Sequence, residues 1–304
     1  MKRKTLSLIC AAALLLTLAL AGCSQVNTPQ LANQLTFSLD GISEVTISYD
    51  EEEVTFFEGE GNDLVVKEYM TSDKKSYHAK VNEQSGSIKV SEGGKPIFKD
   101  NFSRYIEVYL PGSYQNELTV TTTNGNIDFS KVDLNLSALR VDSTSGAVQV
   151  GNATAKELHL SSTSGTLNLG NLEAETIRLE TTSGNVSCEK LNGTVTYTST
   201  SGNAEFLNAV GSGSYRADNS GKLQVTYTNV TGDLSLFNKN DSVDLILPSD
   251  LEFDFQATTK NGSISTSFQE SIAINGDTTS GTVGAHPTVT VKVETKNGNI
   301  EVSQ

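Results

Sequence analysis

Residues 142–146, "DSTSG", are the first of four nearly identical phrases in the chain. The others are "SSTSG" at 161–165, "ETTSG" at 180–184 and "TSTSG" at 198–202, so the phrase returns every 18 or 19 residues. A regular period of this length is typical of a repeat architecture, in which each repeat forms one structural unit. The phrase therefore predicts a polar turn that occurs once per repeat.

The repeat extends well beyond these four phrases. A marker position steps from Gly125 to Gly262 at intervals of 21, 19, 19, 18, 19, 20 and 21, with Asp241 at one step. Pro111 and Pro248 stand at the same distance before the first and the last of these glycines, so the two prolines are seven repeats apart. The repeat thus organises most of the chain.

Two short runs of alternating apolar residues surround each polar turn. Leu158 and Leu160 precede "SSTSG", and Leu167 and Leu169 follow it. Period-two alternation in such short runs indicates strands with one buried face. Because a strand this short needs neighbours, we expect equivalent strands of successive repeats to pair in parallel. The sequence predicts an all-β, single-domain parallel β-solenoid with rungs of about 19–20 residues, and ten or eleven rungs give a rod roughly 50 Å long.

The "STSG" phrase itself is interpreted as a structural corner between two strands. Its glycine is expected to supply a positive φ, and its hydroxyls are expected to bond to nearby backbone. If the corners also bind a ligand, one threonine per rung is the candidate contact: Thr144, Thr163, Thr182 and Thr200. A leucine-rich repeat is the rival interpretation, but that architecture has one strand per repeat and a fixed Asn or Cys column.

Residues 1–23 have the pattern of a bacterial targeting segment. Three basic residues precede an apolar run of roughly fifteen residues, which is short for a membrane span of about 20. The run ends in "LAGC", which resembles a lipobox and predicts lipidation of Cys23. We therefore expect a signal peptide at 1–22, a flexible tether at 23–34 and the solenoid at 35–304, with less regular rungs serving as a cap at 35–100.

Charge and cysteine content narrow the range of partners. Removing residues 1–22 takes away three basic groups and changes the formal net charge from −14 to −17. Such a surface repels nucleic acid and anionic lipid headgroups. With Cys10 lost and Cys23 lipidated, only Cys188 remains, so no internal disulfide is expected.

Several phrases together resemble a known family. "IEVYLP" with "LTVTTTNGNIDF", the serial "STSG" units, and "VDLILP" with "FDFQATTKNG" are similar to the bacterial "putative adhesin" family of β-strand-repeat domains of unknown function. The likeness spans roughly residues 45–304. The resemblance implies a β-repeat fold and an extracellular role, and it implies no catalytic residue and no ligand.

The residues show no recognisable catalytic or metal-binding constellation. Outward positions of successive rungs hold mixed residues such as Gln149, Asn168, Ser187 and Glu205, so no column of paired carboxylates is expected. The acidic residues at 51–53 are interpreted as a solvated turn, His159 as a surface residue between two arginines, and Cys188 as a buried thiol. The corners offer Ser and Thr where calcium sites need carboxylates. We predict no enzyme activity, no metal site and no cofactor.

The leading functional hypothesis is a lipid-anchored binding or structural module of the bacterial cell envelope, outside the cytoplasm. Its partners would be the membrane, through the anchor, and an envelope polymer, another cell surface or a membrane protein. An accessory of envelope-stress signalling that binds another membrane protein is the alternative hypothesis. A polysaccharide-acting enzyme is a third, minor hypothesis.

Overall fold

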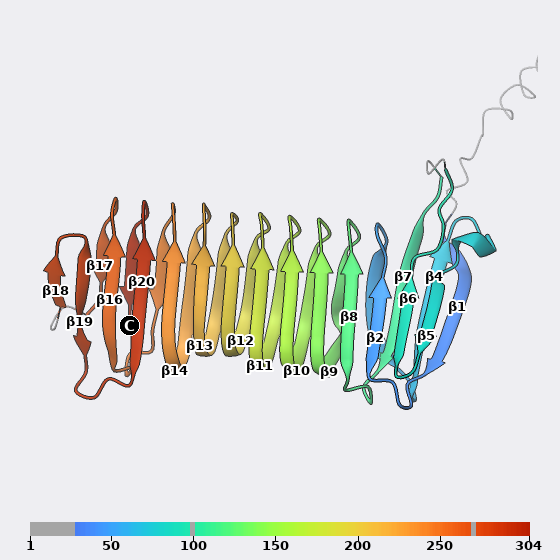
Figure 1. Ribbon diagram of the computed structural model, residues 1–304, viewed down its shortest axis with the longest axis horizontal. Helices are drawn as coiled ribbons and strands as arrows, with labels where there is room; N and C mark the ends of the chain where they lie inside the picture. Colours follow the sequence, from blue (N-terminus) through green and yellow to red (C-terminus); the bar gives the residue numbers. More distant parts are fainter. Residues whose placement is uncertain (1–27, 98–100, 269–271) are drawn as a thin grey trace, which may run out of the picture.

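The structure is a computed structural model that describes residues 28–97, 101–268 and 272–304. Its centre consists of six long strands that lie side by side in parallel (Figure 1). Each strand runs along one face of the molecule, bends, and continues along the opposite face, so that one strand belongs to two stacked layers. The six are β9 (Ile127–Ser143), β10 (Val148–Ser162), β11 (Leu167–Thr181), β12 (Val186–Ser199), β13 (Ala204–Ala217) and β14 (Leu223–Asn238).

The register between these strands follows the sequence repeat. Val148 pairs with Leu167, and Leu158 pairs with Ile177, so each residue pairs with its equivalent in the next repeat. Every pair of inward residues expected from the alternation is buried, including Leu158 with Leu160 and Val186 with Cys188. The expected solenoid and its rung length are therefore confirmed.

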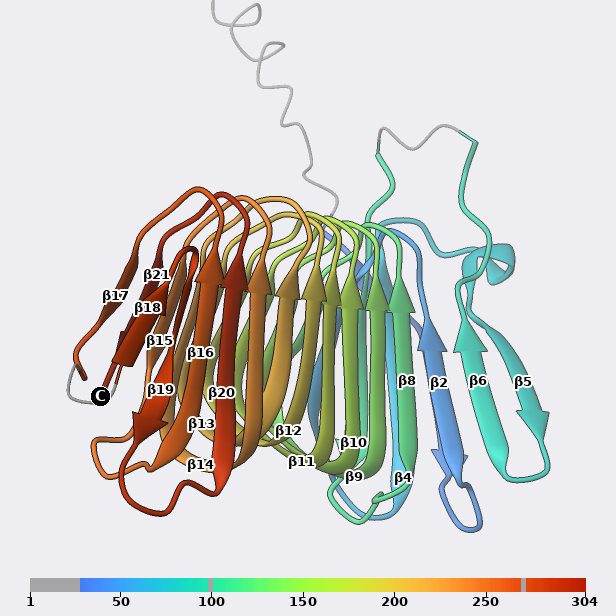
Figure 2. The same cartoon turned by 60° about the vertical axis from the view of Figure 1, so that its left-hand side comes forward.

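Corners join the two layers along one edge of the molecule (Figure 2). We call the layer whose strands lead into the corners the leading face, and the layer whose strands leave them the trailing face. Side chains from both faces meet in one continuous core, which contains aromatic residues as well as aliphatic ones. Phe206, for example, packs against Tyr197 and Tyr215 with ring centroids 5.2 Å apart in each pair.

At the N-terminal end, the order of strands in space differs from their order in the sequence. On the leading face β2 lies between β6 and β8, and on the trailing face β3 lies between β7 and β9. The first rung of the sequence is therefore an internal rung of the stack. These strands are β2 (Glu44–Ser48), β3 (Glu53–Gly59), β6 (Ser87–Ser91), β7 (Arg104–Pro111) and β8 (Glu117–Thr122).

The C-terminal end repeats this arrangement. β20 lies between β14 and β16, and β21 lies between β15 and β17, all in parallel. The last residues of the sequence thus fill the penultimate rung of the stack. These strands are β15 (Val243–Ile246), β16 (Phe253–Thr259), β17 (Ile264–Thr266), β20 (Val289–Thr295) and β21 (Ile300–Ser303).

Antiparallel strands cover parts of both ends. β4 pairs with β7, and β1 pairs with β4; β5 pairs with β6; β19 pairs with β16, and β18 with β19. Within the described residues the only helical segment is a short 3-10 turn, η1 (Lys75–Tyr77). The covering strands are β1 (Gln30–Ser38), β4 (Asp63–Met70), β5 (Lys80–Gln84), β18 (Ile272–Asn275) and β19 (Thr278–Val283).

This topology confirms part of the sequence-based expectation and corrects the rest. Each face contains eleven parallel strands, in agreement with ten or eleven rungs. The expectation that rungs stack in sequence order is wrong at both ends. The tether expected at 23–34 is also too long, because β1 begins at Gln30. Residues 1–27 lie outside the described residues.

The corner glycines are explained by close packing and not, in general, by positive φ. Of the marker glycines from Gly125 to Gly262, only Gly202 and Gly221 have a positive φ. A Cβ atom on Gly165 would instead lie 2.0 Å from the carbonyl oxygen of Gly146, and a Cβ on Gly146 would lie 1.8 Å from that of Gly125. At each marker glycine the corner backbone packs against the neighbouring corner with no space for a side chain.

The close approach predicts that Gly165→Ala destabilises the fold. The added methyl group must push two backbone segments apart, and such overpacking costs about 1–3 kcal/mol. Gly151→Ala is the matched control, because its Cβ would make only ordinary contacts, the shortest being 3.4 Å to Ser130. Urea unfolding of both variants measures the difference. Equal stability of the two variants would contradict this account of the corners.

Candidate functional surface

The first hydroxyl of each "S/T-x-x-G" corner points into the molecule. Ser143 Oγ donates a hydrogen bond to the carbonyl oxygen of Gly146 over 2.9 Å, and Thr181 Oγ1 donates to that of Gly184 over 3.3 Å. Both side chains are buried. In these two corners the hydroxyl closes the turn where the strand pairing is interrupted, as expected. The equivalent hydroxyls of Ser162 and Ser199 are also buried but have no hydrogen-bond partner among the described residues.

The second residue of each phrase points outward instead. All four candidate contacts are exposed, and none of their side chains hydrogen-bonds to another described residue. Their backbones are fixed from rung to rung, since the Ser164 amide donates to the carbonyl oxygen of Thr144 and the Ser183 amide donates to that of Thr163. The corners therefore present a row of hydroxyls along one edge of the rod. We call these residues the corner threonines: Thr144, Thr163, Thr182 and Thr200.

A shallow depression of about 370 Å³ lies beside this row on the leading face. Thr163 and Thr182 both line it, together with Glu180 and Thr198. Thr144 and Thr200 do not line this depression. The structure thus brings two of the four predicted residues to one concavity and leaves the other two on the ridge.

A network of charged side chains crosses three rungs next to the depression. His159 Nδ1 lies 3.0 Å from Arg140 Nη1, and His159 Nε2 lies 3.3 Å from Glu180 Oε2. Arg178 Nε donates to Glu180 Oε1 over 2.6 Å. Burial tends to raise the pKa of Glu180, but the hydrogen bonds from Arg178 and His159 outweigh it and lower the pKa.

The environment predicted for His159 is confirmed, since it lies between the arginines of neighbouring rungs. Arg140 Nε also donates to Asp142 Oδ2 over 2.8 Å. The sequence interpretation missed both carboxylates of this network, because Asp142 and Glu180 belong to the next outward column. The signal that could have found them is that each carboxylate follows an arginine by two positions, Asp142 after Arg140 and Glu180 after Arg178. All of these charges have partners within the network, so it holds the surface in place.

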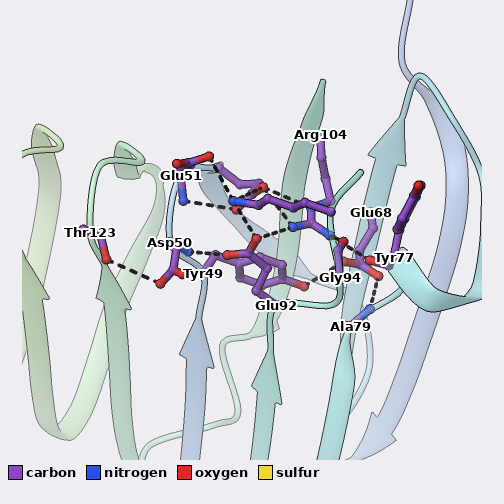
Figure 3. A network of polar contacts seen from close by, with 12 residues as sticks. Tyr49, Asp50, Glu51, Glu68, Tyr77, Ala79, Glu92, Gly94, Arg104 and Thr123 are labelled. Atoms are coloured by element: carbon purple, nitrogen blue, oxygen red, sulfur yellow. Dashed lines mark hydrogen bonds and ion pairs between the residues drawn. The ribbon is translucent and has the colours of Figure 1, made fainter. Parts of the chain in front are cut away.

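A second polar cluster lies inside the N-terminal end of the rod (Figure 3). The fully buried side chain of Arg104 donates from Nη2 to Glu52 Oε1 over 2.9 Å and to Glu92 Oε1 over 2.7 Å. Lys95 Nζ lies 2.6 Å from the same Glu92 oxygen. Burial alone would lower the pKa of Lys95, but its hydrogen bond to Glu92 and the nearby carboxylates raise it.

This cluster corrects the interpretation of residues 51–53 as a solvated turn at Glu52, whereas Glu51 and Glu53 are exposed as expected. Glu52 is buried and occupies a corner position of the stack. The next corner glycine, Gly125, packs directly on it, because a Cβ at position 125 would lie 1.8 Å from the carbonyl oxygen of Glu52. The turn therefore anchors the N-terminal end through an ion pair with Arg104. Sequence alone gave no sign of this pairing, since the two side chains are far apart in the chain.

Glu68 extends the cluster into the core. It is completely buried, and its carboxylate accepts hydrogen bonds from Tyr49 over 3.2 Å, Asn33 over 2.8 Å and the Ala79 amide over 2.7 Å. Burial, together with the Glu68 carboxylate, raises the pKa of Tyr49 well above its ordinary value. Because its groups are paired internally, this cluster stabilises the end of the rod.

Cys188 and the metal-binding candidates show no reactive arrangement. Cys188 is buried, as predicted, and burial raises the pKa of its thiol to about 12. Across the described ranges, no group of three His, Cys, Asp or Glu side chains could hold a metal ion. In the same ranges, no helix is long and apolar enough to cross a membrane. Cys23 lies outside the described residues.

Comparison with known proteins identifies the family. The model of the Toastrack DUF4097 family matches residues 42–303, which is most of the chain. The protein therefore belongs to this family of β-repeat domains. No curated protein matches the chain.

Solved bacterial structures show a distant likeness. A "putative adhesin" from Parabacteroides distasonis has 12% identity and a TM-score of 0.47, with 88% of this chain and 96% of that chain covered. A "putative adhesin" from Parabacteroides merdae has 14% identity and a TM-score of 0.36, covering 90% and 96%. A "putative cell adhesion protein" from Clostridium sporogenes has 13% identity and a TM-score of 0.31, covering 91% and 99%.

Loss of the buried cation is predicted to destabilise the N-terminal end strongly. Arg104→Ala removes the fully buried partner of the buried Glu52 carboxylate and one of the two cations at the partly buried Glu92 carboxylate, which costs about 3–5 kcal/mol. Arg140→Ala is the control, because Arg140 is 49% exposed and its ion pair with Asp142 contributes less than about 1 kcal/mol. Thermal unfolding measures both losses. Comparable losses of stability in the two variants would show that the buried cluster does not stabilise the N-terminal end.

The Cys188 thiol is predicted to be unreactive in the folded protein at pH 8. A thiol whose pKa is about 12 stays protonated there, and its burial excludes reagents. Residues 24–304 contain every described strand and no other cysteine, so a thiol-reactive dye reports on Cys188 alone. The same chain in denaturant is the positive control and reacts within minutes. Rapid labelling of the folded chain would contradict the assignment.

Proposed function

We propose that this member of the Toastrack DUF4097 family is a non-enzymatic, adhesin-like binding module, anchored by lipid to the outside of the bacterial cell membrane. The observation that carries the proposal is the continuous stack of eleven rungs, which aligns the outward side chains of equivalent positions in rows along the rod. A repeated surface contacts extended ligands through many weak interactions at once.

The position of the chain's start supports display away from the membrane. β1 and β18 lie at opposite ends of the rod (Figure 1). Since Cys23 precedes Gln30, the first residue of β1, by only seven positions, a lipid on Cys23 would hold the N-terminal end near the bilayer. The regular rungs would then extend outward, where an envelope polymer or another cell surface can reach them.

The corner threonines are the proposed contact row. They are exposed, they follow one another rung by rung, and two of them line a common depression. Hydroxyl groups donate and accept hydrogen bonds, so this row suits a polar polymer that lies along the rod. The charged groups beside it satisfy one another, which supports a role in binding without catalysis.

Removing the corner hydroxyls is predicted to weaken binding with no change in folding. With Thr144, Thr163, Thr182 and Thr200 all changed to alanine, capture of envelope polymer should fall about tenfold or more, because contacts along a row act together. The matched control changes four exposed threonines away from the corners to alanine: Thr154, Thr176, Thr194 and Thr231.

The measurement is crosslinking of the full-length protein in cells, followed by identification of everything that co-purifies. Polymer capture that is lost in the corner variant and kept in the control variant is the expected result. Unchanged capture in the corner variant would overturn the contact row. Recovery of one defined membrane protein, without polymer, would favour the signalling-accessory hypothesis instead.

A further inference from the structure

A shallow groove of about 320 Å³ lies on the trailing face, away from the corner threonines, and crosses β10, β11 and β12. Gly151 and Gly170 line it, and neither contributes a side chain that could fill it. A Cβ on Gly170 would lie 2.4 Å from the carbonyl oxygen of Gly151, so close backbone packing keeps this part of the groove open.

One wall of the groove is a row of outward polar side chains. Gln149, Asn168 and Ser187 stand in register on three neighbouring strands, and all three are exposed. None of these side chains hydrogen-bonds to another described residue. Their donors and acceptors therefore face the groove and are available to a ligand, and they recur at intervals of about 4.8 Å.

The other wall is a fixed ladder of amides. Asn171 Nδ2 donates to Asn152 Oδ1 over 2.7 Å, and Asn152 Nδ2 donates to Asp133 Oδ1 over 2.8 Å. Each bond orients the next amide, so the wall is organised before any ligand arrives. This pre-organisation reduces the entropy lost on binding.

The chemistry of the lining selects a neutral, hydroxyl-rich ligand. Among the side chains that line the groove, only Glu189 is charged. An anionic ligand would find no cation there and would meet a chain with a net charge of −14. Amides and hydroxyls both donate and accept, which matches the hydroxyl groups of a sugar. Equivalent groups on successive rungs suit a polymer that runs along the rod.

We propose that this groove, the amide groove, binds a neutral polysaccharide chain through Gln149 and Asn168. The inference deepens the proposed function by naming the ligand class of a second surface, and it depends on that function only in taking the protein to be a binding module. The polymer lies across the strands, with the side chains of successive rungs contacting successive sugar units.

The test measures binding of the full-length protein, purified in detergent, to defined oligosaccharides. The probes are neutral hexamers of glucose with β-1,4 linkage, of glucose with α-1,4 linkage and of N-acetylglucosamine, with oligogalacturonate as the acidic comparison. We expect at least one neutral hexamer to bind and oligogalacturonate not to bind. Binding of oligogalacturonate alone, or of no neutral hexamer, overturns the inference.

Variants locate the site. Gln149→Ala combined with Asn168→Ala removes two sets of hydrogen bonds and should weaken binding about tenfold or more. Gln256→Ala is the matched control, because Gln256 is exposed on β16 of the leading face and does not line the groove. The affinity of this control variant for the neutral hexamer should stay within about twofold of that of the unmodified protein. Equal effects of the two changes would place the binding elsewhere and overturn the assignment.

The outcome is distinguishable from failure of the proposed function. If the neutral hexamers do not bind but cells still yield polymer in the crosslinking experiment, the amide groove is wrong and the binding module stands. If the hexamers bind as expected but the corner variant keeps all its partners, the amide groove stands and the corner row is wrong.

Discussion

Close packing of backbone on backbone at the corners is the constraint on which the rest of the structure depends. The carbonyl oxygen of one corner glycine occupies the space that a Cβ of the next would need, at 2.0 Å for Gly165 over Gly146. This contact fixes how each rung is aligned with the rung next to it. Once the corners are in register, inward residues form continuous columns and each strand finds parallel partners on both sides. The core, the outward rows and the groove all inherit their spacing from this stack.

The ends of the rod are held by a different device. Both the first and the last rung of the sequence are inserted as internal rungs, so β2 and β20 each have a partner on both sides. The last two strands of the chain are thereby held between neighbours, whereas β1, within the described residues, pairs with β4 alone. Antiparallel strands then cover parts of the exposed ends, and the buried Arg104 cluster ties the N-terminal covering strands to the first corner. Stability at the ends therefore comes from topology and one ionic cluster.

The stack also explains why the candidate sites are composite. A single rung offers one corner threonine and at most two outward amides of the groove, which is little surface for binding. Parallel stacking places equivalent side chains next to one another, so that residues one repeat apart in sequence line one depression or one groove. The two surfaces lie on different faces and have different chemistry: hydroxyls beside paired charges at the corners, and uncharged amides in the groove.

The sequence by itself determined the solenoid, its rung length and its inward residues, because the regular return of the corner phrase and the alternation of period two are local patterns that stacking repeats unchanged. It also placed the corner threonines outward and Cys188 inward. The insertion of β2 and β20 between other rungs could not be predicted from the sequence, because no local pattern specifies which strands a given strand pairs with. The buried ion pair of Glu52 and Arg104 was hidden in the same way, because the pair is made across rungs. Only the tertiary structure showed that the corner glycines are needed for close packing. The atom that excludes a side chain there is a carbonyl oxygen of the neighbouring rung, and the glycine's own backbone conformation gives no sign of it.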